Sequence, residues 1–585
     1  MGANLGEPLP PGDDHAVSVS LPKWSDTLGW ASRDPAVLSR LQAGYPRFYV
    51  PHVVRHLADA LVAWIAADSP RRGLESASGQ AAMLFPSQRM AEDCRRYLER
   101  EDGRRCLEKE DAVAIIHVSL DGRATPTDSV TATCSPIPGQ HVFVVVYPEQ
   151  LGSEARAFWQ HTGFGISSRF AAFWLSKASF LQRGGGVTAG VTAGVTAGVT
   201  AGVTAGVTAG VTAGVTAGVT DGVTAVTELP LQEARRATLS LRQRIAGLYS
   251  TAPNNVAVGD VYLYPTGMSA VAHTALALRS LGTRASGDYR VAVFGFLYVD
   301  TFKVLSKVHG FHCVLYGHAS SSDMDALEKD LESGVHYDAL YTEFPGNPLL
   351  GSLDLHRLDA LSKRHGFLVV VDDTIGTSVN LNLAPLCHVV CTSLTKMFSG
   401  ACNVMGGSAV LSPRSSHHEK LRSAFSDAHL DTYFPPDVVV MDRNSADFTS
   451  RVLSASQNAE RLVERLRGHR AVETVFYPKG SPTQHLYDRY KRAGGEYGYL
   501  LSIRFVKPAA AIAFHDALDV AKGPSLGTNF TLCCPYTLLA HYSELEWAAK
   551  YGVFEHLVRI SVGIEESGAL ERIVERALAA AEEHC

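Results

Sequence analysis

The sequence lacks the features that would place the protein in a membrane or on a nucleic acid. No apolar stretch reaches the roughly 18 residues that a membrane-spanning helix needs, and the first residues have neither the basic start nor the apolar core of a secretory leader. Acidic residues (59) slightly outnumber basic ones (53), for a net charge of -6, and no run of one sign dominates. We therefore expect no membrane or nucleic-acid partner and a cytoplasmic location.

Cysteine is absent from the patterns that bind metals or build disulfide frameworks. The ten cysteines are scattered over 585 residues, without a C-x-x-C pair and without the cysteine–histidine spacing of a zinc site. Cys533 and Cys534 are adjacent, which is more typical of two packed thiols than of a ligand pair. We expect reduced thiols and no metal.

One segment has almost no variety. From Val187 the tetrapeptide VTAG occurs eight times in succession and then drifts into VTDG and VTAV. Glycine at every fourth position, together with frequent valine and threonine, disfavours a helix, and such small side chains do little to drive core formation. We interpret residues 184–228 as a loosely extended low-complexity insert. A binding surface built from the repeat is the alternative.

The insert divides the chain. Residues 1–183 contain short strand-like runs and a helix-like run, and we expect them to form an α/β extension. Strands and helices then alternate with short connections through residues 229–415, which predicts an α/β domain with a mostly parallel sheet between helices. Residues 416–585 read as a separate C-terminal α+β domain. The strands expected in the central sheet are Val261–Tyr264, Arg290–Phe294, His312–Tyr316, Ala339–Glu343 and Phe367–Asp372.

Two motifs beyond the ends of the predicted strands carry charged groups, at the place where open parallel sheets bind ligands. Asp372 ends a run of three valines, and a carboxylate there can pair with a protonated pyridine nitrogen. Lys396 follows 24 residues later, in Thr392-Ser393-Leu394-Thr395-Lys396. It suits a Schiff base, with the hydroxyls donating to a phosphate. Alone, the aspartate is a helix cap or Mg²⁺ ligand and the lysine a solvated charge. Together they favour pyridoxal-5′-phosphate (PLP).

Two further motifs complete this pattern. Tyr264-Pro265-Thr266-Gly267-Met268 is a strand, a glycine turn and a helix start, whose first amides and dipole form an anion site. Tyr298 follows the next strand and can stack on a cofactor ring and then act as an acid or base. In isolation the first is an ordinary strand–helix loop and the second a core aromatic.

In this order the motifs resemble the Cys/Met-metabolism family of fold-type I PLP-dependent enzymes, the group of cystathionine γ-synthase and the cystathionine β- and γ-lyases. The resemblance covers roughly residues 231–585 and includes Glu343-Phe-Pro-Gly-Asn347-Pro348, Ser525-Leu-Gly527 and Arg559-Ile-Ser-Val-Gly-Ile-Glu565. Upstream, the runs SVSLPKWSDTLGW, GYPRFYVPH and FWQHTGFGISSRF are similar to the N-terminal extension of fungal cystathionine γ-synthases.

The resemblance implies a role for each matched residue. Lys396 carries PLP and is catalytic together with Tyr298, which also stacks on the ring. Asp372 holds the ring nitrogen, while Arg559 and Ser525 bind the substrate carboxylate. The other residues implied to bind the cofactor are Gly267, Met268, Asn347, Ser393, Thr395 and, reaching over from a neighbouring subunit, Arg169.

Three positions depart from the family pattern. Ser167 stands where a tyrosine usually precedes the arginine by two residues, and Ala401 replaces a common histidine. Val299-Asp300 replaces the two glycines that usually follow the stacking tyrosine. These changes leave the expected cofactor site in place and put the second substrate in doubt.

The activity that the resemblance implies is γ-replacement on an O-acyl-L-homoserine, in the first place with L-cysteine to form L-cystathionine. A related enzyme that uses another nucleophile, such as an O-acetylhomoserine sulfhydrylase or an enzyme of secondary metabolism, is the alternative, as is a cystathionine lyase. A catalytically silent member of the family is a third. The resemblance also implies small amino-acid substrates and a homodimer or homotetramer with active sites shared between subunits.

Overall fold

The computed structural model describes residues 3–46, 48–67, 78–100, 113–126, 137–183, 228–252, 254–282 and 288–585. All of the expected insert except Glu228 lies outside these residues. The chain forms two compact units. The large unit comprises Met1–His52, Ser153–Ser167 and Pro230–Cys585, and the small unit comprises Val53–Gly152 and Ser168–Leu229. The expected extension, residues 1–183, is therefore divided between the two units.

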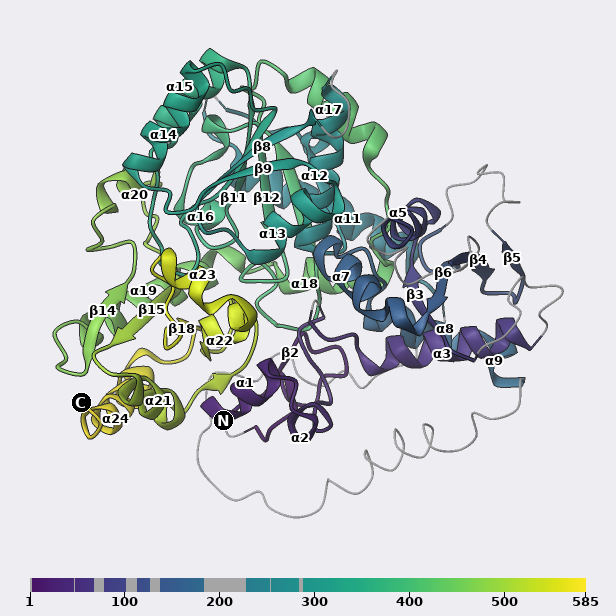
Figure 1. The fold of residues 1–585 in the computed structure, drawn as a ribbon, viewed down its shortest axis with the longest axis horizontal. Helices are drawn as coiled ribbons and strands as arrows, with labels where there is room; N and C mark the ends of the chain where they lie inside the picture. Colours follow the sequence, from purple (N-terminus) through teal and green to yellow (C-terminus); the bar gives the residue numbers. More distant parts are fainter. Residues whose placement is uncertain are drawn as a thin grey trace. The chain divides into compact units, whose positions relative to one another are not determined.

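A seven-stranded sheet in the order β7-β13-β12-β11-β10-β8-β9 forms the centre of the large unit (Figure 1). Strands β9, β8, β10, β11 and β12 pair in parallel, and β13 pairs antiparallel with both β12 and β7. This confirms the expected mostly parallel α/β fold. The strands are β7 Val261–Tyr264, β8 Arg290–Phe294, β9 His312–Tyr316, β10 Ala339–Glu343, β11 Leu368–Asp372, β12 Val389–Ser393 and β13 Gly407–Leu411.

The helices between these strands begin and end where local chemistry favours it. Helix α12 (Gly267–Leu281) starts at Thr266, whose side chain accepts a hydrogen bond of 2.9 Å from the amide of Ser269. Helix α15 (Leu355–His365) ends at Gly366, which has a left-handed φ of 79°. The others are α11 Leu231–Tyr249, α13 Val299–Lys303, α14 Ser321–Glu332, α16 Thr377–Asn380, α17 His418–Ala428 and α18 Pro435–Asn444.

The C-terminal part of the large unit has a second sheet, in the order β14-β15-β18-β17-β16, which is antiparallel except for the β16–β17 pair. The strands are β14 Val472–Phe476, β15 Leu500–Phe505, β16 Ala521–Lys522, β17 Leu532–Pro535 and β18 Val558–Ser561. The helices are α19 Phe448–Leu466, α20 Gln484–Tyr490, α21 Pro508–Ala517, α22 Tyr536–His541, α23 Leu545–Lys550 and α24 Ser567–Glu582. Apolar residues of α19, α21 and α24 form one buried cluster with the strands.

The N-terminal segment of the large unit lies against this C-terminal part. It contains β1 (Pro8–Leu9), β2 (Ser18–Val19), α1 (Trp24–Ala31) and α2 (Pro35–Leu38). The amide of Leu21 donates a hydrogen bond to the Lys522 carbonyl over 2.8 Å. The residue after Lys522 is Gly523, and a side chain there would clash, because its Cβ would lie 2.0 Å from the Val19 carbonyl oxygen. Helix α7 (Gly152–Thr162) also packs within the large unit, apart from its first residue.

The small unit is built on an antiparallel sheet in the order β3-β6-β4-β5. Its central strand β6 is apolar and buried from Val142 to Tyr147. The strands are β3 Gln80–Phe85, β4 Ala114–Ser119, β5 Ala124–Pro126 and β6 His141–Pro148, and the helices are α3 His52–Ala66, α5 Gln88–Leu98, α8 Ser168–Lys177 and α9 Ser179–Arg183. In the part of the chain that the structure describes, no helix of either unit is both long and apolar enough to cross a membrane.

Candidate active site

A cavity, partly open to solvent, lies beyond the carboxyl ends of β8, β10, β11 and β12. All of its described lining residues belong to the large unit. Among them are Gly267, Met268, Tyr298, Asn347, Asp372, Ser393, Thr395, Lys396, Ser525 and Arg559. The structure therefore brings together every site residue predicted from the sequence except Arg169.

Lys396 is buried in the turn after β12, with 8% of its surface exposed. Its Nζ donates hydrogen bonds to the Ser525 hydroxyl (2.9 Å) and the Tyr45 hydroxyl (3.1 Å). It also lies 4.2 Å from the centre of the Tyr45 ring. Hydroxyl groups accept a hydrogen bond from an ammonium and donate one to a neutral amine. These partners therefore suit the Lys396 side chain in either protonation state.

Two carboxyl groups line the cavity side by side, that of Glu343 buried and that of Asp372 half-buried. Asp372 ends β11, Glu343 ends β10, and the two residues are paired in the sheet register. Burial raises the pKa of Asp372, and burial together with the nearby Asp372 charge raises the pKa of Glu343. Two such acids resist ionisation together unless a cation joins them. This donor set fits the protonated ring nitrogen of PLP.

The start of α12 forms a cradle for an anion. Its first amides have no partners within the helix, and the helix dipole favours negative charge there. A Cβ on Gly267 would lie 2.6 Å from the Ser393 Cβ, so only glycine allows the two turns to approach. Thr395 braces this region, since its hydroxyl donates to the Gly406 carbonyl (3.2 Å) and accepts from the Gly406 amide (3.1 Å). The cradle fits a phosphate group.

Arg559 lies on β18 and is 5% exposed. Its Nη1 donates to the Asn347 amide oxygen (3.1 Å) and its Nη2 to the Ser525 carbonyl (2.9 Å). The guanidinium lies 4.6 Å from the centre of the Tyr536 ring. These partners are uncharged, so the positive charge is available to a substrate carboxylate. Ser525 has a left-handed φ of 96°, a strain that functional sites often carry in non-glycine residues.

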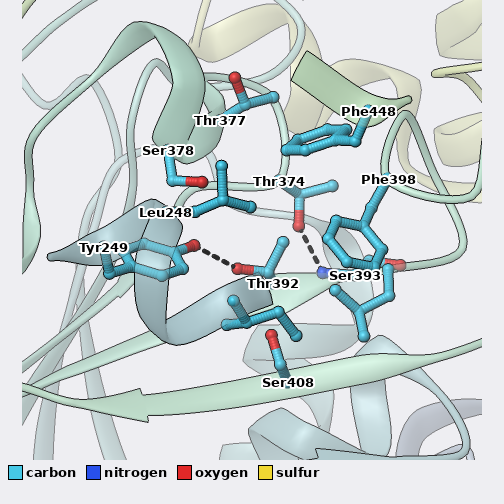
Figure 2. Close-up of a pocket in the computed structure, with 12 residues that line it drawn as sticks. Leu248, Tyr249, Thr374, Thr377, Ser378, Thr392, Ser393, Phe398, Ser408 and Phe448 are labelled. Carbon is cyan, nitrogen blue, oxygen red and sulfur yellow. Dashed lines mark hydrogen bonds between the residues drawn. The ribbon is translucent and has the colours of Figure 1, made fainter. Parts of the chain in front are cut away.

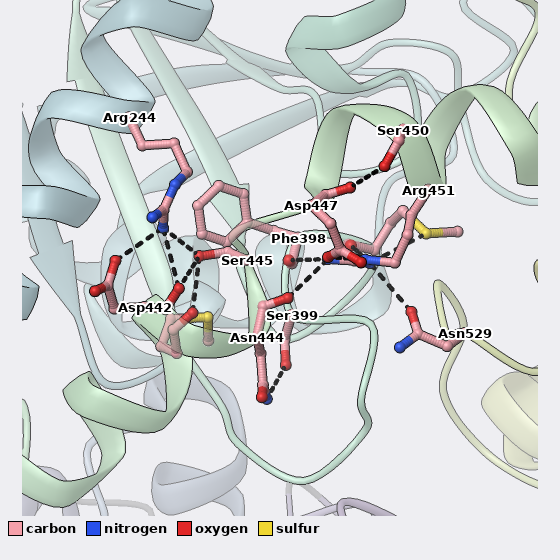
Figure 3. A network of polar contacts seen from close by, with 12 residues as sticks. Arg244, Phe398, Ser399, Asp442, Asn444, Ser445, Asp447, Ser450, Arg451 and Asn529 are labelled. Atoms are coloured by element: carbon pink, nitrogen blue, oxygen red, sulfur yellow. Dashed lines mark hydrogen bonds and ion pairs between the residues drawn. The ribbon is translucent and has the colours of Figure 1, made fainter. Parts of the chain in front are cut away.

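Arg451, on α19, braces the turn that carries the lysine (Figure 3). It is buried, and its guanidinium donates to the carbonyls of Met397 (2.7 Å) and Phe398 (2.9 Å) and pairs with Asp447 (2.7 Å). A Cβ on Gly400 would lie 2.2 Å from Arg451 Nη1. Sequence reasoning missed Arg451 because its main partners are backbone carbonyls, which leave no residue pattern.

A second polar network joins the end of α11 to β12, where the hydroxyl oxygens of Tyr249 and Thr392 lie 3.0 Å apart (Figure 2). The Tyr249 hydroxyl donates to Asp373 Oδ2 over 2.7 Å, and the Thr392 hydroxyl donates to Asp373 Oδ1 over 2.6 Å. Burial raises the pKa of Asp373 to about 7, although both hydroxyls oppose the rise. The network fixes the ends of β11 and β12, from which Asp372 and the lysine turn extend.

The structure explains one departure from the family pattern. Asp300, which replaces a glycine after Tyr298, is buried and pairs with His161 Nδ1 over 2.7 Å. Gln160 Nε2 donates to the same oxygen over 3.1 Å. The neighbouring Gly163 carbonyl accepts from the Thr266 hydroxyl over 3.2 Å. Residues 153–167 thus brace both the turn after Tyr298 and the start of α12.

The remaining upstream prediction concerns Arg169. It lies in the first turn of α8 in the small unit and is half-buried. Its role at the phosphate of a neighbouring subunit stays a prediction. The sequence analysis did not select Tyr45 as a site residue. Tyr45-Pro46-Arg47 nevertheless has a tyrosine two residues before an arginine, the family spacing in which Ser167 replaces the tyrosine before Arg169. Arg47 lies outside the described residues.

Comparison with known proteins identifies the family. Residues 238–579 match the family described as "Cys/Met metabolism PLP-dependent enzyme", and residues 53–167 match "Fungal trans-sulfuration enzyme, N-terminal domain". The chain belongs to the Cys/Met metabolism family of PLP-dependent enzymes. The resemblance seen in the sequence is thereby confirmed, and so is PLP as the cofactor.

Relatives of the chain match it over nearly its full length. A cystathionine gamma-synthase of Neurospora crassa is 37% identical over 99% of this chain and 98% of its own. A cystathionine gamma-synthase-like enzyme of Amanita muscaria is 36% identical over 98% of this chain and 97% of its own. The crystal structure of cystathionine gamma synthase from Xanthomonas oryzae pv. oryzae shares the fold, with a TM-score of 0.52 and 24% identity over 60% of this chain and 88% of that one.

Proposed function

We propose that the protein catalyses γ-replacement on an O-acyl-L-homoserine with L-cysteine, giving L-cystathionine and the free carboxylic acid. The observation that carries the proposal is that one cavity is lined by Lys396, Asp372 and Arg559. These supply an amine, a counter-charge for the cofactor ring and a carboxylate anchor. Similarity to the Neurospora crassa cystathionine gamma-synthase over the whole chain supports this reaction in particular.

PLP, when bound, supplies an electron sink that acidifies the α and β carbons of the substrate. Asp372 would hold the ring nitrogen, Tyr298 the ring face, and the start of α12 with Ser393 the phosphate. Lys396 would carry the cofactor until a substrate amine replaces it.

The protein's own groups then orient the substrate and move its protons. Arg559 holds the α-carboxylate, which directs the Cα–H bond toward Lys396. The Lys396 amine removes that proton and can return it elsewhere, and its hydroxyl partners keep it within the cavity. Loss of a Cβ proton expels the γ-acyloxy group as a carboxylate. The cysteine thiolate then bonds to Cγ, and protons returned to Cβ and Cα complete the product.

A second candidate is the same chemistry with another nucleophile. The chain is as similar to the cystathionine gamma-synthase-like protein ankD of Aspergillus thermomutatus, at 37% identity, as to the cystathionine gamma-synthase of Neurospora crassa. Arg559 would hold the amino-acid half of the acylated substrate, while Lys396 and Asp372 would hold the cofactor, so none of the three selects the nucleophile.

Product analysis separates the candidates. The holoenzyme is incubated with O-acetyl- or O-succinyl-L-homoserine and with L-cysteine, other thiols or carbon nucleophiles, and the products are identified by mass spectrometry. We expect L-cystathionine, formed fastest with L-cysteine and absent with Lys396→Ala. A faster product from another nucleophile would establish the second candidate. A 2-oxo acid and ammonia formed from L-cystathionine without acylated homoserine would make the protein a lyase.

A further inference from the structure

Tyr536 lines the cavity beside Arg559, although the sequence analysis did not select it. Strand β17 ends one residue earlier and pairs with β18, so that Cys534 lies opposite Arg559. The amide of Tyr536 continues this pairing by donating to the Leu557 carbonyl over 3.0 Å. The register of the two strands therefore fixes the Tyr536 backbone near the arginine. The Tyr536 ring is buried, and its centre lies 4.6 Å from the guanidinium.

The Tyr536 hydroxyl holds the amide of Asn347 in one orientation. Arg559 Nη1 donates to Asn347 Oδ1 over 3.1 Å, and a guanidinium cannot accept a hydrogen bond, so the amide oxygen faces the arginine. The amide nitrogen of Asn347 then donates to the Tyr536 hydroxyl over 3.3 Å. Tyr536 thus acts on Arg559 in two ways, directly through its ring face and indirectly through Asn347.

His541 and Glu544 hold the Tyr536 hydroxyl in turn. Glu544 Oε1 lies 2.9 Å from His541 Nδ1, and this hydrogen bond lowers the pKa of Glu544. A carboxylate only accepts, so Nδ1 carries the proton, and Nε2 of the neutral ring accepts from the Tyr536 hydroxyl over 3.4 Å. Burial raises the pKa of Tyr536, which keeps its hydroxyl protonated. The buried His541 ring also packs against Phe296, with 4.9 Å between ring centres.

This network fixes the plane of the guanidinium without neutralising its charge. The ring face of Tyr536 attracts a cation but occupies none of its N–H groups. The two hydrogen-bond acceptors, Asn347 Oδ1 and the Ser525 carbonyl, are uncharged. Arginine binds a carboxylate best through two parallel hydrogen bonds in one plane. The affinity for a carboxylate therefore depends on the groups that hold this plane.

We propose that Tyr536 is a positioning residue for Arg559, which holds the guanidinium in the orientation that binds the α-carboxylate of the amino-acid substrate. His541 and Glu544 support it by fixing its hydroxyl. The proposal deepens the proposed function and rests on it, since it needs Arg559 as the carboxylate anchor. It assigns to Tyr536 the preference for a free α-carboxylate over an uncharged amide or ester.

Binding of two unreactive ligands tests this proposal. L-Norleucine resembles the amino-acid half of the substrate without a leaving group, and L-norleucinamide has an uncharged amide in place of the carboxylate. The Kd of each for the holoenzyme is measured by titration of the cofactor's visible absorbance, in the wild type, Tyr536→Phe and Tyr536→Leu. Tyr477→Phe is the matched control. Tyr477 is also buried and donates to a backbone carbonyl, that of Gly498, over 2.9 Å, but it is not among the described residues that line the cavity.

We expect Tyr536→Leu to weaken L-norleucine binding by roughly 10-fold, because the arginine loses a buried aromatic partner. L-Norleucinamide binding should change by less than about 2-fold, since this ligand offers the arginine no carboxylate. Tyr536→Phe keeps the ring and loses the hydrogen bond to Asn347, so L-norleucine binding should weaken by roughly 3-fold. KM for the acylated homoserine should rise in the same order with little change in kcat. Tyr477→Phe should change none of these values.

The outcomes separate this proposal from the proposed function. Equal binding of the two ligands by the wild type would remove Arg559 as the carboxylate anchor, and both proposals would fail. A wild-type preference for L-norleucine that persists in Tyr536→Leu would overturn the role of Tyr536 alone. An equal loss of affinity for both ligands in the Tyr536 variants, or loss of bound PLP from both variants, would also overturn that role.

The support from His541 has its own test. His541→Gln keeps a polar group that can reach the Tyr536 hydroxyl, whereas His541→Leu does not. We expect His541→Leu to weaken L-norleucine binding as Tyr536→Phe does, while His541→Gln stays near the wild type and L-norleucinamide binding is unchanged in both. Equal L-norleucine affinity of the two His541 variants would show that this histidine does not act through Tyr536.

Discussion

The two units differ in what they bury. The large unit buries Glu343, Asp373, Lys396, Arg451 and Arg559, each with hydrogen-bond partners. Among the described residues of the small unit, every buried side chain is apolar or aromatic. Because burying polar groups is costly even when they are paired, their concentration at the strand ends of one sheet indicates a functional site. The described buried residues of the small unit form an apolar core.

This comparison predicts that substitutions of the polar residues lining the cavity change the chemistry, and that substitutions in the apolar core of the small unit change stability. The largest effect on activity among four substitutions should come from Asp372→Asn. The cofactor ring loses its buried counter-charge, and cofactor affinity should fall by roughly 30-fold, or about 2 kcal/mol, with a larger loss of kcat. Equilibrium dialysis of PLP measures the affinity. Unchanged affinity and rate would remove Asp372 from the site.

Arg559→Lys should have the next largest effect. A lysine keeps the charge but loses the planar fork that binds a carboxylate with two parallel hydrogen bonds. We expect KM for the acylated homoserine to rise roughly 10-fold, which corresponds to about 1.4 kcal/mol, while PLP binding is unchanged. Steady-state kinetics at saturating cofactor measure this. A rise in KM for the thiol alone would place Arg559 at the other substrate.

Asp373→Asn should affect the pH dependence of stability more than activity. Burial raises the pKa of Asp373 to about 7 in the folded protein, against about 3.9 in an unfolded chain. The folded state therefore favours the protonated form, and this contribution to stability is lost as the pH rises toward and through 7. The slope is at most about 1.4 kcal/mol per pH unit. Thermal unfolding between pH 4 and 8 should show a smaller decline for the variant, and identical curves would contradict the assignment.

Leu61→Ala, in the core of the small unit, should have the smallest effect on activity. Leu61 lies on α3 and is fully buried. The substitution leaves a cavity and should lower the free energy of unfolding by about 2–5 kcal/mol. The kcat per bound PLP should be unchanged at temperatures where the protein stays folded. A variant that remains folded by circular dichroism but loses kcat would show that the small unit takes part in catalysis.

The sequence predicted the site best where a reactive side chain stands directly at the end of a recognisable strand or helix pattern. Three valines before Asp372 indicate a buried strand with a carboxylate at its end. A lysine 24 residues later, Lys396, then indicates PLP as the cofactor. Contacts between distant segments have no such pattern. The pairs Tyr45–Lys396 and His161–Asp300 join residues 351 and 139 positions apart, and the division of residues 1–183 between the two units depends on the same long-range packing.

The most direct test of the account is to locate the lysine that carries the cofactor. The holoenzyme is reduced with borohydride, which makes the covalent link to PLP permanent, and is then digested and mapped by mass spectrometry. We predict a single pyridoxyl label, on the peptide that contains Lys396, and no label in Lys396→Ala. A label on any other lysine, or a reducible link that persists in Lys396→Ala, would contradict the account.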